Sequence, residues 1–304
     1  MRMIGLLSAM STCFVFLLSG CASVEPLELT YVQWNIGHFA MGKGPATTLA
    51  PADAPRRAQE YRALLDILRP DILGLSEYED SFDTAGTPAA QAVFTDFSTF
   101  AIGPRNDYQW NATLLRPGIE ELSTERLDYP KRWQKTYALI SHCRARGVDF
   151  TVVQTHLDWD CDGRMGQCHT NRQDQIRTLI ERFKTTPRVI ISGDFNINKS
   201  REYEAFVKAG YTSVNYGAWG EMLTFRPTEP DHDFGLDNIL VKGFDCLVPF
   251  TADPAYRLSD HLPLCVRLRA KPTSACRSPE ELLDAEFRQA RKDFLPALWG
   301  DSAR

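Results

Sequence analysis

The chain has 304 residues, of which 43% are apolar and 24% charged, a balance typical of globular proteins that excludes disordered and fibrous classes. The length allows one large domain or two small ones. Without Arg2, the one charged residue of the first 20, the formal net charge is about −6. An acidic surface does not favour non-specific attraction to DNA. It does not exclude a nuclease, because a metal site can supply local positive charge.

The first residues have the pattern of an export signal. Arg2 precedes a short apolar stretch, Ile4 to Leu18, and the segment ends in Leu-Ser-Gly before Cys21. This ending resembles a bacterial lipoprotein signal, in which the cysteine receives lipid on its sulfur and becomes the new N-terminus. We therefore predict a signal peptide at 1–20, lipidation of Cys21 and a tether at 21–29. The alternative is a plain signal peptide with an incidental cysteine.

Lipidation at Cys21 implies that the exported chain is held at a bacterial membrane by acyl chains and does not span it. Ala22 and Ser23 follow the cysteine, and Asp does not. By resemblance to enterobacterial sorting, this favours the outer membrane or cell envelope.

Beyond the tether, strand-like apolar runs alternate with segments of helical spacing. In chain order we predict a strand at Tyr31–Trp34, a helix at Arg56–Leu68, strands at Asp71–Leu75, Asn111–Leu115, Thr136–His142 and Asp149–Thr155, a helix at Gln173–Phe183, a strand at Val189–Gly193, a helix at Arg201–Lys208, and strands at Leu236–Val241 and Leu262–Leu268.

No change in composition interrupts the region from about residue 28 to 270. The alternation of strands and helices therefore predicts one α/β domain at 30–270, with layers of sheet faced by helices. Ser278-Pro279-Glu280-Glu281 is typical of a helix start, so we predict a C-terminal helical appendage at 271–304.

Six cysteines besides Cys21 lie beyond the signal, and export permits disulfides. Cys161 and Cys168 bracket a short polar loop, which favours a disulfide between them. A zinc site is the alternative, because His169 follows Cys168. No Cys-x-x-Cys pair supports zinc.

Eight polar residues share one position in the sequence: each stands at the end or start of an apolar, strand-like run. One alone is usually a turn residue, a helix cap or a buried histidine. Strand ends in one sheet, however, can converge on a single rim, where ligands of α/β proteins commonly bind. The set is Asn35, Glu77, His156, Asp194, Asn196, Asp237, Asp260 and His261.

These residue types suit one kind of chemistry. Carboxylates with an amide oxygen, and no cysteine among them, are typical of a hard-cation site fit for Mg²⁺. Two histidines can bind a phosphoryl oxygen or protonate a leaving group. The sequence has no Gly-x-x-x-x-Gly-Lys-Ser/Thr loop and no Gly-x-Ser-x-Gly elbow, so nucleotide-driven and serine-esterase mechanisms lack support.

The chain resembles the endonuclease/exonuclease/phosphatase (deoxyribonuclease I-like) superfamily over residues 30–268. The resemblance implies a four-layer α/β sandwich, with two packed, mostly antiparallel sheets flanked by helices. The motifs that carry it, in the family's order, are Q-W-N-I-G, D-I-L-G-L-S-E-Y, N-A-T-L-L, Q-T-H-L, N-R-Q-D-Q-I, S-G-D-F-N, L-D-N-I-L-V and S-D-H-L-P-L.

The resemblance also implies a metal site. Glu77 matches the family's principal metal ligand, helped by Asn35 and Asp260. The expected cofactor is Mg²⁺, with Mn²⁺ possible. Tyr78 follows Glu77 where many relatives carry Gln, Val or Thr.

The catalytic roles follow from the same resemblance. Asp194 matches the residue that orients or deprotonates the attacking water, and Asn196 the residue that supports it and touches the phosphate. His156 matches the phosphate-contacting histidine. His261 matches the second histidine, held by the carboxylate of Asp237.

Two function classes are weighed against each other. The first is a metal-dependent phosphoesterase that acts on a phosphate mono- or diester, with an exported nuclease as its alternative. The second is a lipoprotein that keeps the fold for binding without catalysis. Retention of the Asp-x-Asn and Asp-His pairs favours catalysis. The expected partner is a phosphate-ester substrate, whether nucleic acid, phospholipid or small phosphorylated metabolite; basic and aromatic rim candidates are Arg105, Arg132, Trp133, Arg164 and Arg226.

Overall fold

The computed structural model describes residues 26–37, 54–78, 93–104, 110–130, 136–159, 165–226, 234–253 and 258–272. The signal peptide, the lipidation site Cys21 and nearly all of the C-terminal appendage lie outside these residues, so they stay predictions. Leu27–Ala270 forms one compact unit. Within the ranges just given, no helix is long and apolar enough to cross a membrane.

Six strands form the first sheet, here sheet A: β1 (Glu28–Asn35), β2 (Ile72–Ser76), β3 (Thr99–Ile102), β4 (Ala112–Leu115), β11 (Phe244–Thr251) and β12 (Leu264–Ala270). Their order is β11-β12-β1-β2-β4-β3. β1 and β2 run parallel, and the other neighbours run antiparallel.

Six further strands form sheet B: β5 (Ile119–Asp128), β6 (Tyr137–Ala145), β7 (Val148–His156), β8 (Val189–Asp194), β9 (Thr212–Ser213) and β10 (Asp237–Lys242). Their order is β5-β6-β7-β8-β10-β9, with β7 and β8 as the parallel pair. Each sheet is therefore mostly antiparallel, as expected.

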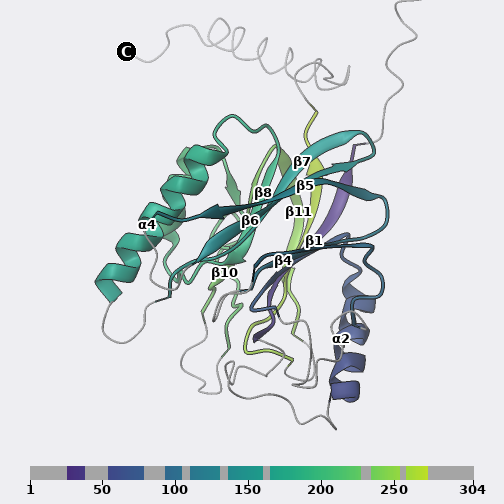
Figure 1. Cartoon of the computed structure of the whole chain (residues 1–304). Helices are drawn as coiled ribbons and strands as arrows, with labels where there is room; N and C mark the ends of the chain where they lie inside the picture. Colours follow the sequence, from purple (N-terminus) through teal and green to yellow (C-terminus); the bar gives the residue numbers. More distant parts are fainter. Residues whose placement is uncertain are drawn as a thin grey trace, which may run out of the picture. The chain divides into compact units, whose positions relative to one another are not determined.

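Helices cover the outer faces of the two sheets (Figure 1). Helix α2 (Ala54–Leu68) packs Tyr61 and Leu65 against Trp34 of sheet A. Helix α4 (Met165–Arg182) packs Ile176 and Leu179 against sheet B, together with a 3₁₀ turn (Ser200–Tyr203) and the short helix α5 (Glu204–Lys208). The sequence of layers is helix, sheet, sheet, helix, which confirms the predicted four-layer α/β sandwich.

Strand residues alternate between the outer and inner faces of each sheet. On β1, Val32 and Trp34 face helix α2, whereas Leu29 and Tyr31 face the space between the sheets. There they meet side chains of sheet B such as Val152. Both faces are buried, which explains why the central strands are rich in apolar residues.

Several predicted boundaries are wrong. Helix α4 begins at Met165, eight residues before the predicted start at Gln173, because its first turns carry polar residues without apolar periodicity. The helix predicted at Arg201–Lys208 is a 3₁₀ turn followed by α5. Four strands were not predicted: β3, β5, β9 and β11. All four are edge strands, and most of their side chains are exposed or only half-buried.

The described residues leave the predicted disulfide untested and show two other cysteines buried in the core. Cys161 lies outside the described residues, so its disulfide with Cys168 stays a prediction, and Cys168 is buried near the start of α4. Cys143 and Cys265 are free. Burial raises the pKa of each thiol to about 12, so both act as small apolar core residues.

Gly74 occupies a position in β2 where no side chain fits. A Cβ there would lie 2.6 Å from the hydroxyl oxygen of Tyr31 and closer still to Oε1 of Gln154. We expect Gly74→Ala to lower the free energy of unfolding by about 1–3 kcal/mol through overpacking, measured by urea denaturation. Thr113→Val, which changes the residue opposite Gly74 on β4, is the control. An unchanged unfolding midpoint for Gly74→Ala would contradict this packing.

Candidate active site

The register of sheet B brings three predicted site residues to one rim. Asp194 is the last residue of β8, and it lies beside His156, the last residue of β7, on one side. On the other side it pairs with Asp237, the first residue of β10. The convergence predicted from the strand ends is therefore real for this sheet.

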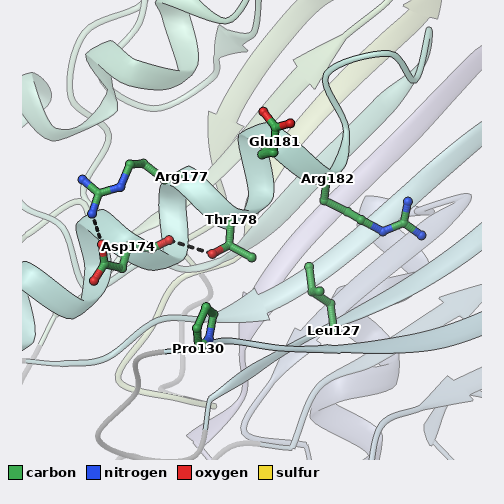
Figure 2. Close-up of a pocket in the computed structure, with 7 residues that line it drawn as sticks. All are labelled: Leu127, Pro130, Asp174, Arg177, Thr178, Glu181 and Arg182. Carbon is green, nitrogen blue, oxygen red and sulfur yellow. Dashed lines mark hydrogen bonds and ion pairs between the residues drawn. The ribbon is translucent and has the colours of Figure 1, made fainter.

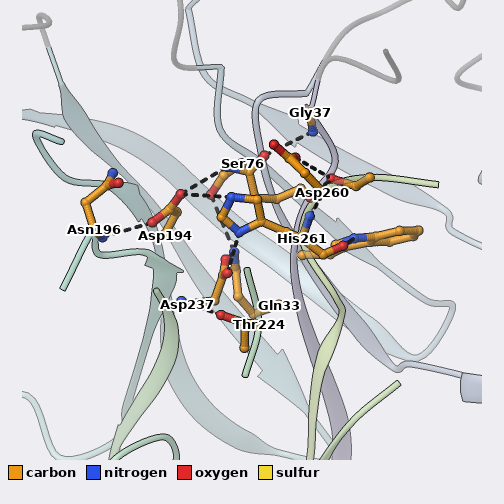
Figure 3. A network of polar contacts seen from close by, with 12 residues as sticks. Gln33, Gly37, Ser76, Asp194, Asn196, Thr224, Asp237, Asp260 and His261 are labelled. Atoms are coloured by element: carbon orange, nitrogen blue, oxygen red, sulfur yellow. Dashed lines mark hydrogen bonds and ion pairs between the residues drawn. The ribbon is translucent and has the colours of Figure 1, made fainter. Parts of the chain in front are cut away.

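Asp194 lies at the centre of the cluster. Its Oδ2 is 3.5 Å from Nε2 of His156 and 3.6 Å from Nε2 of His261. Nδ2 of Asn35 donates to the same oxygen at 3.1 Å, and the backbone N–H of Asn196 donates to Oδ1 at 2.9 Å. Asp194 and His261 point toward each other, with Asn196 beside Asp194 (Figure 3).

These contacts decide the charge of Asp194. Burial raises the pKa of its carboxyl, but the positive potential of His156 and His261 and the two hydrogen bonds outweigh burial. The net result is a pKa below the ordinary value. Asp194 is therefore an ionised carboxylate with imidazole groups on two sides, so it is present in the form that can accept a proton.

Asp237 orients His261. Oδ2 of Asp237 lies 2.6 Å from Nδ1 of His261, and the backbone N–H of Asp237 donates to the Thr224 hydroxyl at 2.9 Å. The ring of Phe225 packs on the imidazole with 4.9 Å between centroids. Burial lowers the pKa of His261, but the negative charges of Asp237 and Asp194 reverse this and raise it to about 10. Nδ1 of His261 faces Asp237, and Nε2 faces Asp194.

His156 is held differently from His261. It is almost fully buried, and its Nδ1 has no hydrogen-bond partner among the residues that the structure describes. The indole ring of Trp159 lies 6.3 Å from the imidazole, between centroids. Among the described residues no carboxylate bonds to Nδ1 of His156, whereas Asp237 bonds to Nδ1 of His261.

Two site residues have backbone conformations that non-glycine residues rarely adopt. Glu77 and Asn196 both have φ of +53°. Such left-handed conformations cost free energy and cluster at functional sites. Asn196 is held there by its backbone bond to Asp194 and by Nδ2, which donates to the carbonyl of Leu157 at 2.9 Å. Both residues lie just after the ends of their strands, β2 and β8.

The predicted metal ligands come from three neighbouring strands of sheet A. Nδ2 of Asn35 donates to Oε1 of Glu77 at 3.1 Å, which joins the ends of β1 and β2. The hydroxyl of Ser259 donates to the carbonyl of Asn35 at 2.8 Å and contacts Oδ1 of Asp260 at 3.3 Å. Asp260 is thereby placed at the rim beside Asn35, just before β12.

The donor set fits a hard divalent cation. Within the described residues no three His, Cys, Asp or Glu side chains have an arrangement that could enclose a metal ion. Mg²⁺ is seldom held in such a cage, because it keeps several waters and takes one or two carboxylates. Glu77 and Asp260 are half-buried, so they can meet a hydrated ion. Together with the Asn35 amide oxygen, they provide oxygen donors of the kind that Mg²⁺ and Mn²⁺ use.

All eight predicted site residues therefore lie in one contact network. Asn35 bridges Glu77 and Asp194, Asp194 contacts both histidines, and Ser259 connects Asp260 to Asn35. Of the predicted rim residues, Arg226 is described, and its guanidinium pairs with Asp253 at 2.8 Å. The others, Arg105, Arg132, Trp133 and Arg164, lie outside the described ranges.

Sequence reasoning missed the polar residues beneath this network. Gln33 and Gln154 are fully buried and point between the sheets. Each stands two residues before a predicted site residue, Asn35 or His156, so each faces the same side of its strand. A glutamine at an inward position of an apolar strand is the signal that could have found them.

An open pocket lies away from this network. It has a volume of about 500 Å³ and lies between the end of β5 and helix α4 (Figure 2). None of the eight site residues lines it. Its lining is Leu127, Pro130, Asp174, Arg177, Thr178, Glu181 and Arg182.

Comparison with known proteins identifies the family and the fold. The family model described as "Endonuclease/Exonuclease/phosphatase family" matches residues 32–261. No curated protein matches the sequence. Among solved structures, an endonuclease/exonuclease/phosphatase protein from Bacteroides vulgatus is similar, with a TM-score of 0.65 and 16% identity over 81% of this chain and 100% of that one. TDP2 of D. rerio, complexed with a single-strand DNA product, has a TM-score of 0.62 and 19% identity over 79% and 98%.

Proposed function

The chain belongs to the endonuclease/exonuclease/phosphatase family, and we propose that it hydrolyses a phosphate mono- or diester by metal-assisted attack of water. Family membership indicates a hydrolase of phosphoester bonds. The proposal of metal-assisted attack by water rests on the position of Asp194. Its Oδ2 lies between the two histidine Nε2 atoms and accepts a hydrogen bond from Asn35.

The ionised Asp194 orients the attacking water and accepts its proton. Nδ2 of Asn196 and Nε2 of His156 lie beside Asp194 and donate to the phosphate oxygens. For Asn196 this uses the hydrogen that is not bonded to the carbonyl of Leu157. His261, with Nδ1 bonded to Asp237, directs Nε2 into the site and stabilises charge that develops on the phosphate or the leaving oxygen. Asp237 keeps the imidazole in this orientation.

Glu77, Asn35 and Asp260 would hold the divalent ion. When bound, such an ion offsets the negative charge on the phosphate and polarises it toward attack. We propose Mg²⁺ as the ion, with Mn²⁺ as a substitute, because the donors are two carboxylates and an amide oxygen.

The alternative function is that of a nuclease, with nucleic acid as the substrate. It has some support from the D. rerio TDP2 complex, because that related fold holds a single-strand DNA product. The acidic net charge of this chain, −5, gives no general attraction for nucleic acid. We therefore propose a phosphoesterase, with a nuclease as its specific alternative and a non-catalytic binding protein as the remaining one.

A substrate panel tests the reaction. The full-length chain, purified in detergent, is incubated with Mg²⁺ on plasmid DNA, single-stranded DNA, a sphingomyelin analogue and inositol phosphates. We expect hydrolysis of at least one substrate, loss of that hydrolysis in EDTA, and recovery on addition of Mg²⁺ or Mn²⁺. Hydrolysis that survives EDTA would contradict a metal-dependent reaction, and no hydrolysis of any substrate would favour the binding protein.

We also propose that the chain is lipid-anchored at Cys21 in a bacterial envelope. Support comes from the apolar stretch and the Leu-Ser-Gly-Cys ending of the signal. Mass spectrometry of the N-terminal peptide from the exported protein provides the test. We expect Cys21 as the first residue with added lipid mass, and an unmodified Cys21 would remove the anchor.

A further inference from the structure

A layer of polar side chains lies between the two sheets, directly beneath the candidate active site. Gln33 of β1, Gln154 of β7 and Ser192 of β8 are all fully buried. The interior of a sandwich is normally apolar, and a buried amide is costly unless it is hydrogen-bonded. Packing alone therefore does not explain why three buried polar side chains lie at one level between the sheets.

The three side chains form a continuous series of hydrogen bonds. The Ser192 hydroxyl donates to Oε1 of Gln154 at 2.7 Å, and Nε2 of Gln154 donates to Oε1 of Gln33 at 2.8 Å. Nε2 of Gln33 then donates to Oδ1 of Asp237 at 3.3 Å. The Tyr31 hydroxyl bonds to Ser192 Oγ, and it is the donor, because the Ser192 hydrogen is used toward Gln154. We call Tyr31, Ser192, Gln154 and Gln33 the donor chain.

Every link of the donor chain donates toward Asp237. The orientation of the Gln33 amide is not free, because its oxygen accepts from Gln154, so its NH₂ group must face the carboxylate. Aligned hydrogen bonds in a low-dielectric interior strengthen one another. The chain therefore ends in a fixed, polarised donor on the carboxylate (Figure 3).

The backbone is built around the donor chain. β2 passes beside Gln33 at Gly74, where a Cβ would collide with Gln154, Tyr31 and Ser192. The hydroxyl of Ser76, two residues on, accepts from Nε2 of Gln154 at 3.1 Å. Sheet A thus leaves space for the glutamines and satisfies their remaining hydrogens.

Asp237 is the link between the donor chain and the site. Its Oδ2 takes the Nδ1 hydrogen of His261, and its Oδ1 takes the Gln33 amide. Two donors on opposite oxygens prevent the carboxylate from rotating, and this fixes the ring of His261. We propose that Gln33 and Gln154 are positioning residues that set His261 through Asp237. This inference rests on the proposed function, because it assigns roles within that site.

A double-mutant cycle tests the route through Asp237. Gln33→Met preserves volume and removes the donor, and we expect it to lower kcat about 10-fold with little change in KM, since a hydrogen bond to a charged group is lost. In the Asp237→Asn background the same change should lower kcat less than about 2-fold, because coupled residues are not additive. Multiplicative effects of the two changes would overturn the proposal.

Thr113→Val is the matched control. Thr113 is buried opposite Gly74 on β4, and its hydroxyl has no hydrogen-bond partner in the part of the chain that the structure describes. It should therefore leave kcat unchanged. Gln154→Met, one link further from Asp237, should lower kcat by less than Gln33→Met does. Equal kcat for Gln33→Met and Thr113→Val would overturn the proposal.

A second measurement does not depend on catalysis. The proton on Nδ1 of His261 gives an NMR resonance that reports on its hydrogen bond to Asp237, and Asp237→Asn identifies it. We expect Gln33→Met to shift this resonance and Thr113→Val to leave it in place. A resonance that Gln33→Met does not move overturns the positioning role. Absence of activity in the unaltered chain would instead contradict the proposed function, while the resonance still tests the donor chain.

Discussion

Asp194→Asn is expected to lower kcat by about 1,000-fold, because it removes the proton acceptor while keeping the shape of the side chain. Oδ2 of Asp194 lies between Nε2 of His156 and Nε2 of His261, and an amide there cannot take up a proton from water. Initial rates on whichever substrate the panel identifies give the measurement. The loss should appear in kcat rather than in KM, because the carboxylate acts on water more than on the bound ester.

Asp245→Asn is the control for this change. Asp245 is exposed on β11, and Asp245→Asn removes one negative charge, as Asp194→Asn does. It should leave kcat unchanged. Thermal unfolding of Asp194→Asn should remain cooperative, which separates a lost proton acceptor from a lost fold. A kcat within about 10-fold of the unaltered chain would exclude Asp194 as the general base.

Glu77→Gln is expected to weaken Mg²⁺ binding by at least about 100-fold, since even residues that only support a metal ligand commonly cost 10- to 100-fold. The amide keeps the shape of Glu77 but removes the charge that attracts the cation. Titration calorimetry with Mg²⁺ measures the affinity directly. The rate should recover in part at high Mg²⁺, whereas the rate of Asp194→Asn should not.

Glu121→Gln provides the comparison. Glu121 is half-buried on β5 and belongs to none of the contacts described for the site. Mg²⁺ affinity should be unchanged in that variant. If Glu77→Gln binds Mg²⁺ as tightly as Glu121→Gln does, the ion does not sit at the ends of β1 and β2, and the metal would have to be sought elsewhere in the chain.

The central part of the fold could be predicted from the sequence because it is buried on both faces. β1, β2, β8 and β10 are largely buried and rich in apolar residues, and a polar residue marks the end or start of each. The edge strands could not be found in this way. β5, for example, exposes most of its side chains and reads as a mixture of charged and apolar residues.

The set of site residues was predicted from residue type, strand position and family resemblance, and the structure brings these residues together. The roles of the single residues remain predictions. Their mutual geometry was not available from the sequence. Nothing in the order of residues shows that Asn35 bridges Glu77 and Asp194, or that Gln33 reaches Asp237, because these contacts join strands from separate parts of the chain. Such contacts depend on the register between strands and between the two sheets.

The alternation of side chains along the strands has a consequence for how this protein can vary. Asn35, His156, Asp194 and Asp237 all occupy inward positions, so inserting one residue into any of their strands would turn that member toward the helices. Insertions in the connections between strands leave this parity intact. The connections, which would select a substrate, can therefore vary in length. The strands that carry the catalytic residues cannot.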